Sequence, residues 1–232
     1  MIEPVTALIA ANLAFVGSHF AMSHPLRAGM VRLLGENGFA GVYSLVSLAC
    51  MVWVAQAFGA VGPGGALLWD GTGDALWIAA SVLTIVALVL VIGAVRGNPA
   101  MAGMGAGMGA GAALKADAKG VFAVTRHPLL WGFAVWAVSH ILIMPNPRTL
   151  VTAGAMGLLA LLGAHLQDRK KRARLGEAWA GWEAKTSFGL RIGKLGAIGL
   201  PLWLAALAVW LGATWLHGWQ GTAPAGIWRW LG

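Results

Sequence analysis

Charge is scarce in this sequence, since only 10% of its 232 residues are Asp, Glu, Lys or Arg. An ordinary soluble domain is about 25% charged. Hydrophobic residues make up 59% of the chain instead, and the mean hydropathy is +0.75. Several uncharged runs approach about 20 residues, the length at which an α-helix crosses a hydrocarbon layer about 30 Å thick. This pattern disfavours a soluble protein and predicts an all-α, polytopic integral membrane protein, a bundle of about six transmembrane helices.

Cysteine is nearly absent as well, because Cys50 is the only one. A single thiol excludes an intramolecular disulfide, and its place in an apolar run favours a small buried hydrophobe. Neither an HExxH nor a CxxC motif occurs, and the interiors of the apolar runs contain no acid. Zinc sites use several Cys, His or carboxylate ligands near one another, so a zinc site is disfavoured.

The apolar runs and the basic residues between them predict a topology. We expect membrane spans at residues 3–23, 38–59, 74–95, 122–143, 149–167 and 196–217. The connecting segments 24–37, 96–126 and 168–195 carry two, four and eight Lys or Arg, and only Arg148 and Arg229 lie elsewhere. By the positive-inside rule, the three basic segments are cytoplasmic and both termini are periplasmic.

The net charge of +8 does not indicate a nucleic-acid partner, because the basic residues lie in loops beside a bilayer. Residues 168–195 combine basic residues with Trp and Phe, which is typical of a cytoplasmic segment lying on anionic headgroups. Residues 97–120 are rich in Gly and Met, but no strand precedes them, so a dinucleotide site is disfavoured. We expect a mobile cytoplasmic loop there. The predicted partner is the lipid bilayer.

Histidines in apolar spans are costly to bury and are therefore functional candidates. His19 and His140 have apolar neighbours on both sides, which favours a ligand role over a ring bonded only to backbone. Haem needs one or two axial side chains in an apolar pocket and basic groups near its propionates. We therefore take His19 and His140 as candidate metal ligands. Arg126 and His127 are candidate cofactor-binding residues, with a purely structural role for His127 equally open.

Two questions about these histidines stay open. Helical rise places His19 and His140 roughly 15 Å apart in depth, whereas two axial ligands flank one iron closely. Either the iron is five-coordinate, or His19 pairs with His127. A further histidine, His165, is expected to cap its helix or to lie beside Asp168.

Four blocks of the chain, GSHFAMSHPLR, GENGFAGVYSLVSLA, VTRHPLLWGFAVWAVSH and DRKKRARLGEAW, resemble the NnrU family of bacterial membrane proteins, which includes the zeta-carotene isomerases. The resemblance covers essentially residues 1–232, so it implies one domain in a bacterial inner membrane. It also implies an association with denitrification, through the production of nitric oxide and nitrite reductases.

The related isomerase implies more specific chemistry. It carries haem b on two histidines, whose positions correspond to His19 and His140, with His127 in support. A redox or isomerase-like activity follows, with a small hydrophobic substrate or a respiratory reductase as a further partner. Ala137 stands where the isomerase has a cysteine, so a thiolate ligand switch is not available here.

A second resemblance supplies the alternative function. The run RHPLLWG, which begins at Arg126, is similar to the RHPxxxG motif of the isoprenylcysteine and phospholipid methyltransferases. In those enzymes this region binds S-adenosylmethionine, and Glu177 and Glu183 are the best match here for their acidic pair. An S-adenosylmethionine-dependent membrane methyltransferase is therefore the alternative, and whether the chain is an enzyme stays open.

Overall fold

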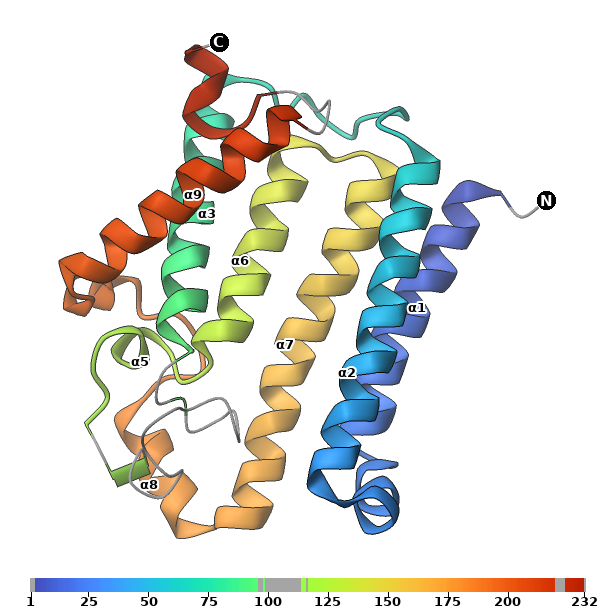
Figure 1. Cartoon of the computed structure of the whole chain (residues 1–232). Coiled ribbons are helices and arrows are strands. Elements are labelled where there is room, and N and C mark those ends of the chain that lie inside the picture. The colour runs from blue at the N-terminus through green and yellow to red at the C-terminus, as the bar shows by residue number, and fades with distance from the viewer. Residues whose placement is uncertain (1–2, 96–97, 99–113, 116, 220–223, 232) are drawn as a thin grey trace.

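The chain folds into helices, and no strand forms within the residues that the computed structural model describes, which are 3–95, 98, 114–115, 117–219 and 224–231 (Figure 1). The apolar helices are α1 (Pro4–Ser23), α2 (Arg27–Val61), α3 (Asp74–Gly93), α6 (Pro128–Ile143), α7 (Pro147–Leu175) and α9 (Leu200–Trp219). The shorter elements are α5 (Val121–Val124), α8 (Glu177–Lys185), η1 (Ile192–Ala197) and η2 (Gly226–Trp230). The predicted all-α membrane bundle is confirmed.

The predicted fourth span, 122–143, is wrong as one continuous helix. The chain leaves helical geometry between α5 and α6, where His127 has φ −119° and ψ 54° and Pro128 takes the first position of α6. Proline disfavours the α conformation in the residue before it and fits the first helical position because it lacks an N–H. α6 therefore has 16 residues and rises about 24 Å, while the other five apolar helices are long enough to cross a membrane.

Other predicted boundaries also differ, and α7 and α8 make most of residues 168–185, expected as a loop, helical. The basic segment 24–37, expected as a loop, is helical from Arg27 onward and is interrupted at Gly35, whose φ of 71° suits a residue without a Cβ. The last span begins at Leu200 rather than at residue 196, because η1 precedes it. The loop expected at residues 97–120 lies largely outside the described residues.

The apolar helices α9, α3, α6 and α7 pack side by side (Figure 1), α1 packs on α7, and α2 packs mainly on α1. Small residues bring neighbours close: a Cβ on Gly132 in α6 would lie 2.6 Å from Val91 Cγ2 and 2.9 Å from the carbonyl oxygen of Ala87, both in α3. Many large apolar side chains of α2 and α9 are exposed. A row of helices with apolar outer faces suits contact with lipid tails. In that environment each backbone polar group must be hydrogen-bonded within its own helix.

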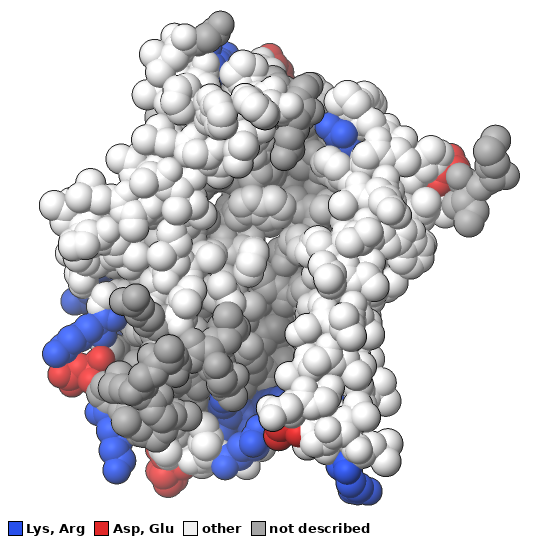
Figure 2. Space-filling view, in the orientation of Figure 1, with Lys and Arg blue, Asp and Glu red and all other residues white. Residues whose placement is uncertain are grey.

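Charge separates the two ends of the bundle. The Lys and Arg side chains gather mainly at the end that holds α8, the α1–α2 turn and the C-terminal part of α7 (Figure 2). Both chain termini lie at the other end (Figure 1). The helices thus alternate in direction as the loop charges predict, which makes this a multi-pass membrane protein with one basic end.

Replacing Gly132 by Ala should lower the free energy of unfolding by about 1–3 kcal/mol, because the new methyl group meets the α3 backbone. Thermal unfolding in detergent micelles measures the change. Gly154→Ala is the matched control, since a Cβ at this α7 position has nothing within 4 Å. A Gly132→Ala protein as stable as this control would contradict the close α3–α6 approach.

Candidate functional site

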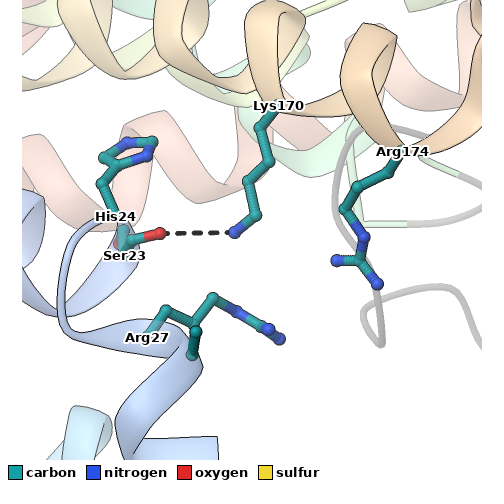
Figure 3. A pocket seen from close by; sticks show the side chains of 6 residues that line it. Ser23, His24, Arg27, Lys170 and Arg174 are labelled. Carbon is teal, nitrogen blue, oxygen red and sulfur yellow. Dashed lines mark hydrogen bonds between the residues drawn. The ribbon is translucent and has the colours of Figure 1, made fainter.

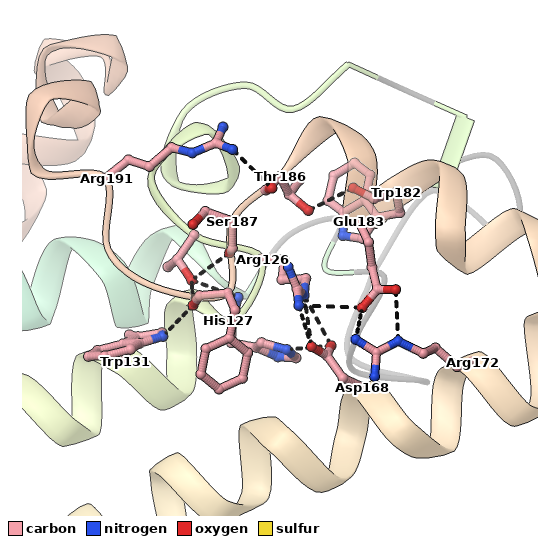
Figure 4. A network of polar contacts seen from close by, with 12 residues as sticks. Arg126, His127, Trp131, Asp168, Arg172, Trp182, Glu183, Thr186, Ser187 and Arg191 are labelled. Atoms are coloured by element: carbon pink, nitrogen blue, oxygen red, sulfur yellow. Dashed lines mark hydrogen bonds and ion pairs between the residues drawn. The ribbon is translucent and has the colours of Figure 1, made fainter.

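The break between α5 and α6 is held by the segment that follows α8. The backbone N–H of Arg126 donates to the carbonyl oxygen of Ser187 at 2.8 Å. The Thr125 hydroxyl donates to the Phe188 carbonyl oxygen at 2.9 Å, and the Trp131 indole N–H donates to the same oxygen at 2.6 Å (Figure 4). The Arg126 N–H thereby gains a partner in place of the helical carbonyl that it lacks, and the two side-chain bonds hold the same segment, so the interruption is a fixed feature of the fold.

A buried carboxylate stands at the centre of this site (Figure 4). Asp168, from α7, accepts hydrogen bonds from Arg126 Nε at 2.9 and 3.1 Å, and its Oδ1 lies 2.7 Å from His127 Nε2. Each of the three residues is less than 10% exposed. His165, expected to cap its helix or to lie beside Asp168, is exposed, and the Asp168 carboxylate pairs with Arg126 and His127 instead.

Glu183, from α8, extends the network toward the surface. It lies 3.3 Å from Arg126 Nη2 and accepts two hydrogen bonds from Arg172, at 2.7 and 2.9 Å. Two guanidinium groups thus face two carboxylates, so the network is balanced without an added ion. The side chains become more exposed outward, from 9% at Arg126 to 18% at Glu183 and 51% at Arg172. The inner pair is consequently the costly one to break.

This geometry gives the RHPxxxG run a role in the fold. Arg126 and His127 bind the carboxylate of α7, Pro128 starts α6, and Gly132 lets α6 pack on α3. A cofactor that took Arg126 Nε or Nη2, or His127 Nε2, would have to displace Asp168. His127 Nδ1 is buried and has no hydrogen-bond partner among the described residues. Glu177 and Glu183, the expected acidic pair, do not both lie against the RHPxxxG run, because only Glu183 contacts Arg126.

His19 lies in an aromatic setting between α1 and α2. Its Nδ1 is 2.8 Å from the carbonyl oxygen of Phe15, which can only accept, so Nδ1 carries the proton. Nε2 lies 3.4 Å from the Ser47 hydroxyl, and the ring packs against the rings of Phe15 and Tyr43. Both ring nitrogens therefore have partners within the fold.

His140, in α6, is held by the fold through Nδ1 only. Its Nδ1 donates to the carbonyl oxygen of Trp136 at 2.9 Å, lies 3.2 Å from Ser139 Oγ, and the ring packs on Trp136 with centroids 4.3 Å apart. No hydrogen bond joins Nε2 to any residue in the described part of the chain. A ring anchored through Nδ1–H presents the Nε2 lone pair outward, which is the arrangement typical of a metal-ligating histidine.

The structure does not bring His19 and His140 together. α7 lies between α1 and α6, and its C-terminal part contacts both Ser23, at the end of α1, and the start of α6. His19 is therefore near the basic end, whereas His140 lies twelve residues, about 18 Å of helix, beyond Pro128. Two axial nitrogens of one iron lie about 4 Å apart. This pair does not fit one haem, and of the two only His140 has a ring nitrogen without a hydrogen bond among the described residues.

An apolar cavity of about 260 Å³ lies between α6 and α7. Its lining comes from α3 (Leu83), α6 (Trp131, Ala134, Val135, Ala137, Val138, Ile141) and α7 (Ala153, Gly154, Gly157, Leu158, Leu161). At 100° per residue, His140 lies on nearly the opposite side of α6 from this lining. The cavity suits an apolar chain. Among the described residues, no group of three or more His, Cys, Asp and Glu lies together as a metal site.

These features define the class: a multi-pass helical membrane protein in which a short apolar helix is fixed at one end by a buried Arg–His–Asp network. The chain belongs to the NnrU family, whose model, described as NnrU protein, matches residues 7–224. No curated protein and no solved structure matches the chain.

The sequence argument missed the two carboxylates of the network, Asp168 and Glu183, as partners of Arg126. A signal existed for the first of them. Asp168 is the only acid between Asp117 and Glu177, and it stands where an apolar run meets a cluster of cations. The cations that follow Asp168 lie on the exposed part of the same helix, so a buried acid there needs a cation from another helix. Arg126 is the basic residue at the start of the preceding span. Glu183 carried no comparable signal.

Replacing Asp168 by Asn should lower the free energy of unfolding by about 3–5 kcal/mol, because it leaves the Arg126 guanidinium buried without its carboxylate. Arg172→Gln is the matched control within the same network. It removes an exposed pair and should cost less than about 1 kcal/mol. Thermal unfolding in micelles compares the two, and equal losses would contradict a network whose strength lies in its buried half.

Proposed function

We propose that this NnrU-family chain is an inner-membrane protein that binds haem b through His140 and acts in denitrification. The observation that carries the proposal is the His140 ring, anchored through Nδ1 and with Nε2 lacking a hydrogen bond among the described residues. The denitrification role rests on family membership alone.

The surroundings of His140 support a single axial ligand. The Trp136 ring packs on the His140 ring and the Trp136 carbonyl oxygen accepts a hydrogen bond from Nδ1–H, so the fold fixes both the tautomer and the ring orientation. His19 is the weaker candidate because the Ser47 hydroxyl lies against its Nε2. Haem held by His140 would supply one-electron chemistry. The chain's own contribution is to hold the ligand nitrogen and to surround it with apolar helices.

Between the redox and isomerase-like activities, the geometry favours the redox one. An isomerase must hold its hydrophobic substrate against the reacting group. The apolar cavity could hold such a chain, but His140 lies on the other side of α6 from its lining. The methyltransferase alternative loses support because the Arg126 guanidinium and His127 Nε2 are bonded to Asp168 within the fold. Titration with S-adenosylhomocysteine should therefore produce no heat beyond dilution.

The orientation in the membrane completes the proposal. The basic end, with α8 and the end of α7, faces the cytoplasm, because Lys and Arg are retained on that side during insertion. Both termini then face the periplasm, and His140 lies toward the periplasmic face. Its α6 neighbours are apolar, so this placement puts the ligand within the outer half of the hydrocarbon layer.

Protein purified from haem-replete cells should show a Soret band that shifts on reduction with dithionite. His140→Ala should lose the band, since the iron loses its protein ligand, while His19→Ala should retain it. Absorption spectra of the three detergent-solubilised proteins, at equal concentration, give the comparison. A colourless wild type would sink the proposal, and a band lost only in His19→Ala would move the ligand to α1.

Single cysteines at matched exposed glycines test the orientation. In a Cys50→Ala background, a membrane-impermeant maleimide should label Gly64→Cys on intact spheroplasts and Gly181→Cys only after permeabilisation. A Cβ at either glycine has nothing within 4 Å, so neither change disturbs packing. The reverse labelling pattern would place the basic end outside and contradict the proposed topology.

A further inference from the structure

A second polar feature lies at the basic end, in a pocket of about 350 Å³ between the α1–α2 turn and the end of α7 (Figure 3). It is lined by Ser23, His24, Arg27, Ala28, Lys170 and Arg174. The lining thus contains three cationic side chains and no carboxylate. Figure 3 shows these side chains converging from the two segments on a shared space.

The cations of this pocket are poorly neutralised within the fold. Lys170 and Arg174 stand one turn apart on α7, where like charges repel each other. Among the described residues neither forms an ion pair, and Lys170 Nζ donates only to the carbonyl oxygen of Ser23, at 3.4 Å. Arg27 has one carboxylate partner, Glu36 at 2.8 Å, which is 62% exposed and lies outside the lining. A net positive charge therefore remains inside the pocket.

The nearest acids of α7 and α8 are committed elsewhere. Asp168 precedes Lys170 by two residues but turns toward Arg126, and Glu183 pairs with Arg126 and Arg172. The same helix end thus contains one network with balanced charge and, beside it, a pocket without an anion. Because the carboxylates of α7 and α8 pair within the first, the second keeps an excess of positive charge that can attract an anion.

The pocket lies at the depth where apolar helices meet water. α1 ends at Ser23, and the apolar part of α7 ends at Leu166, four residues before Lys170. Burial and the nearby Lys170 ammonium lower the pKa of His24, so this ring is neutral near pH 7 and supplies hydrogen bonding rather than charge. This is the level of lipid headgroups in a bilayer.

We propose that the pocket formed by Arg27, Lys170 and Arg174 is a binding site for a phosphate group. Two guanidinium forks and one ammonium give several charge-assisted donors around one space, which suits a tetrahedral oxyanion. The phosphate comes either from the headgroup of an anionic phospholipid or from the free ion. The site is distinct from His140 and does not depend on haem.

The test uses the full-length protein in an uncharged detergent, titrated in one arm with short-chain phosphatidylglycerol and in the other with inorganic phosphate. The melting temperature as a function of ligand concentration gives the apparent dissociation constant. Lys170→Gln and Arg174→Gln should each weaken binding roughly tenfold. Arg169→Gln removes an equal charge from an exposed position outside the lining and should leave binding unchanged.

A fourth variant guards against a general loss of structure. Glu36→Gln frees Arg27 from its partner and should tighten binding, which damage to the fold would not do. Saturation by phosphatidylglycerol alone identifies the headgroup as ligand, and saturation by both probes identifies a site for the free ion as well. No saturable shift with either probe would overturn the proposal, as would an equal weakening by Arg169→Gln.

Discussion

The contact of Asp168 with Arg126 and His127 is the constraint on which the rest of the structure depends. It joins the end of α7 to the start of α6, and all three side chains are buried within the protein, so water does not replace a lost partner. A buried charge pair contributes less through attraction than through the penalty for breaking it. The interaction therefore fixes the position of α6 along α7, because any shift of one helix along the other would leave a charge unpaired.

The pairing of Asp168 with Arg126 and His127 also determines which cations at the basic end stay without a carboxylate. Asp168 and Glu183 serve Arg126 and Arg172, so the cations on the next turn of α7 have no carboxylate of their own. The Lys and Arg residues that set the topology thus have two roles. Arg126 and Arg172 form ion pairs within the fold, and the cations of the pocket remain available at headgroup depth for anions from outside.

The sequence was sufficient for the class of fold but not for the site. Long apolar runs and the alternation of loop charge predict helices and their directions, because lipid leaves the backbone few alternatives. Hydropathy does not locate the break before Pro128, since apolar runs lie on both sides of residues 125–127, and the signal for it is the proline itself. Nor do the apolar runs and loop charges pair Arg126 with Asp168, which lies 42 residues away, because such a contact depends on which helices become neighbours. The interruption of α2 at Gly35 was not predicted either, since the positive φ of this residue depends on the folded structure.

The break also determines the direction in which His140 points. Residues in a helix step by 100°, so the rotation of His140 about the α6 axis is set by where the helix starts, and that start is Pro128, one residue after the pinned His127. If the chain ran helically through residues 125–127, the hydrogen bonds of Arg126 to Ser187 and Asp168 could not form with their present geometry. The same register turns Ala134 and Ala137 toward the apolar cavity and leaves His140 on the other side. A polar network at one end of the bundle thus fixes, through a rigid helix, the orientation of the proposed haem ligand near the other end.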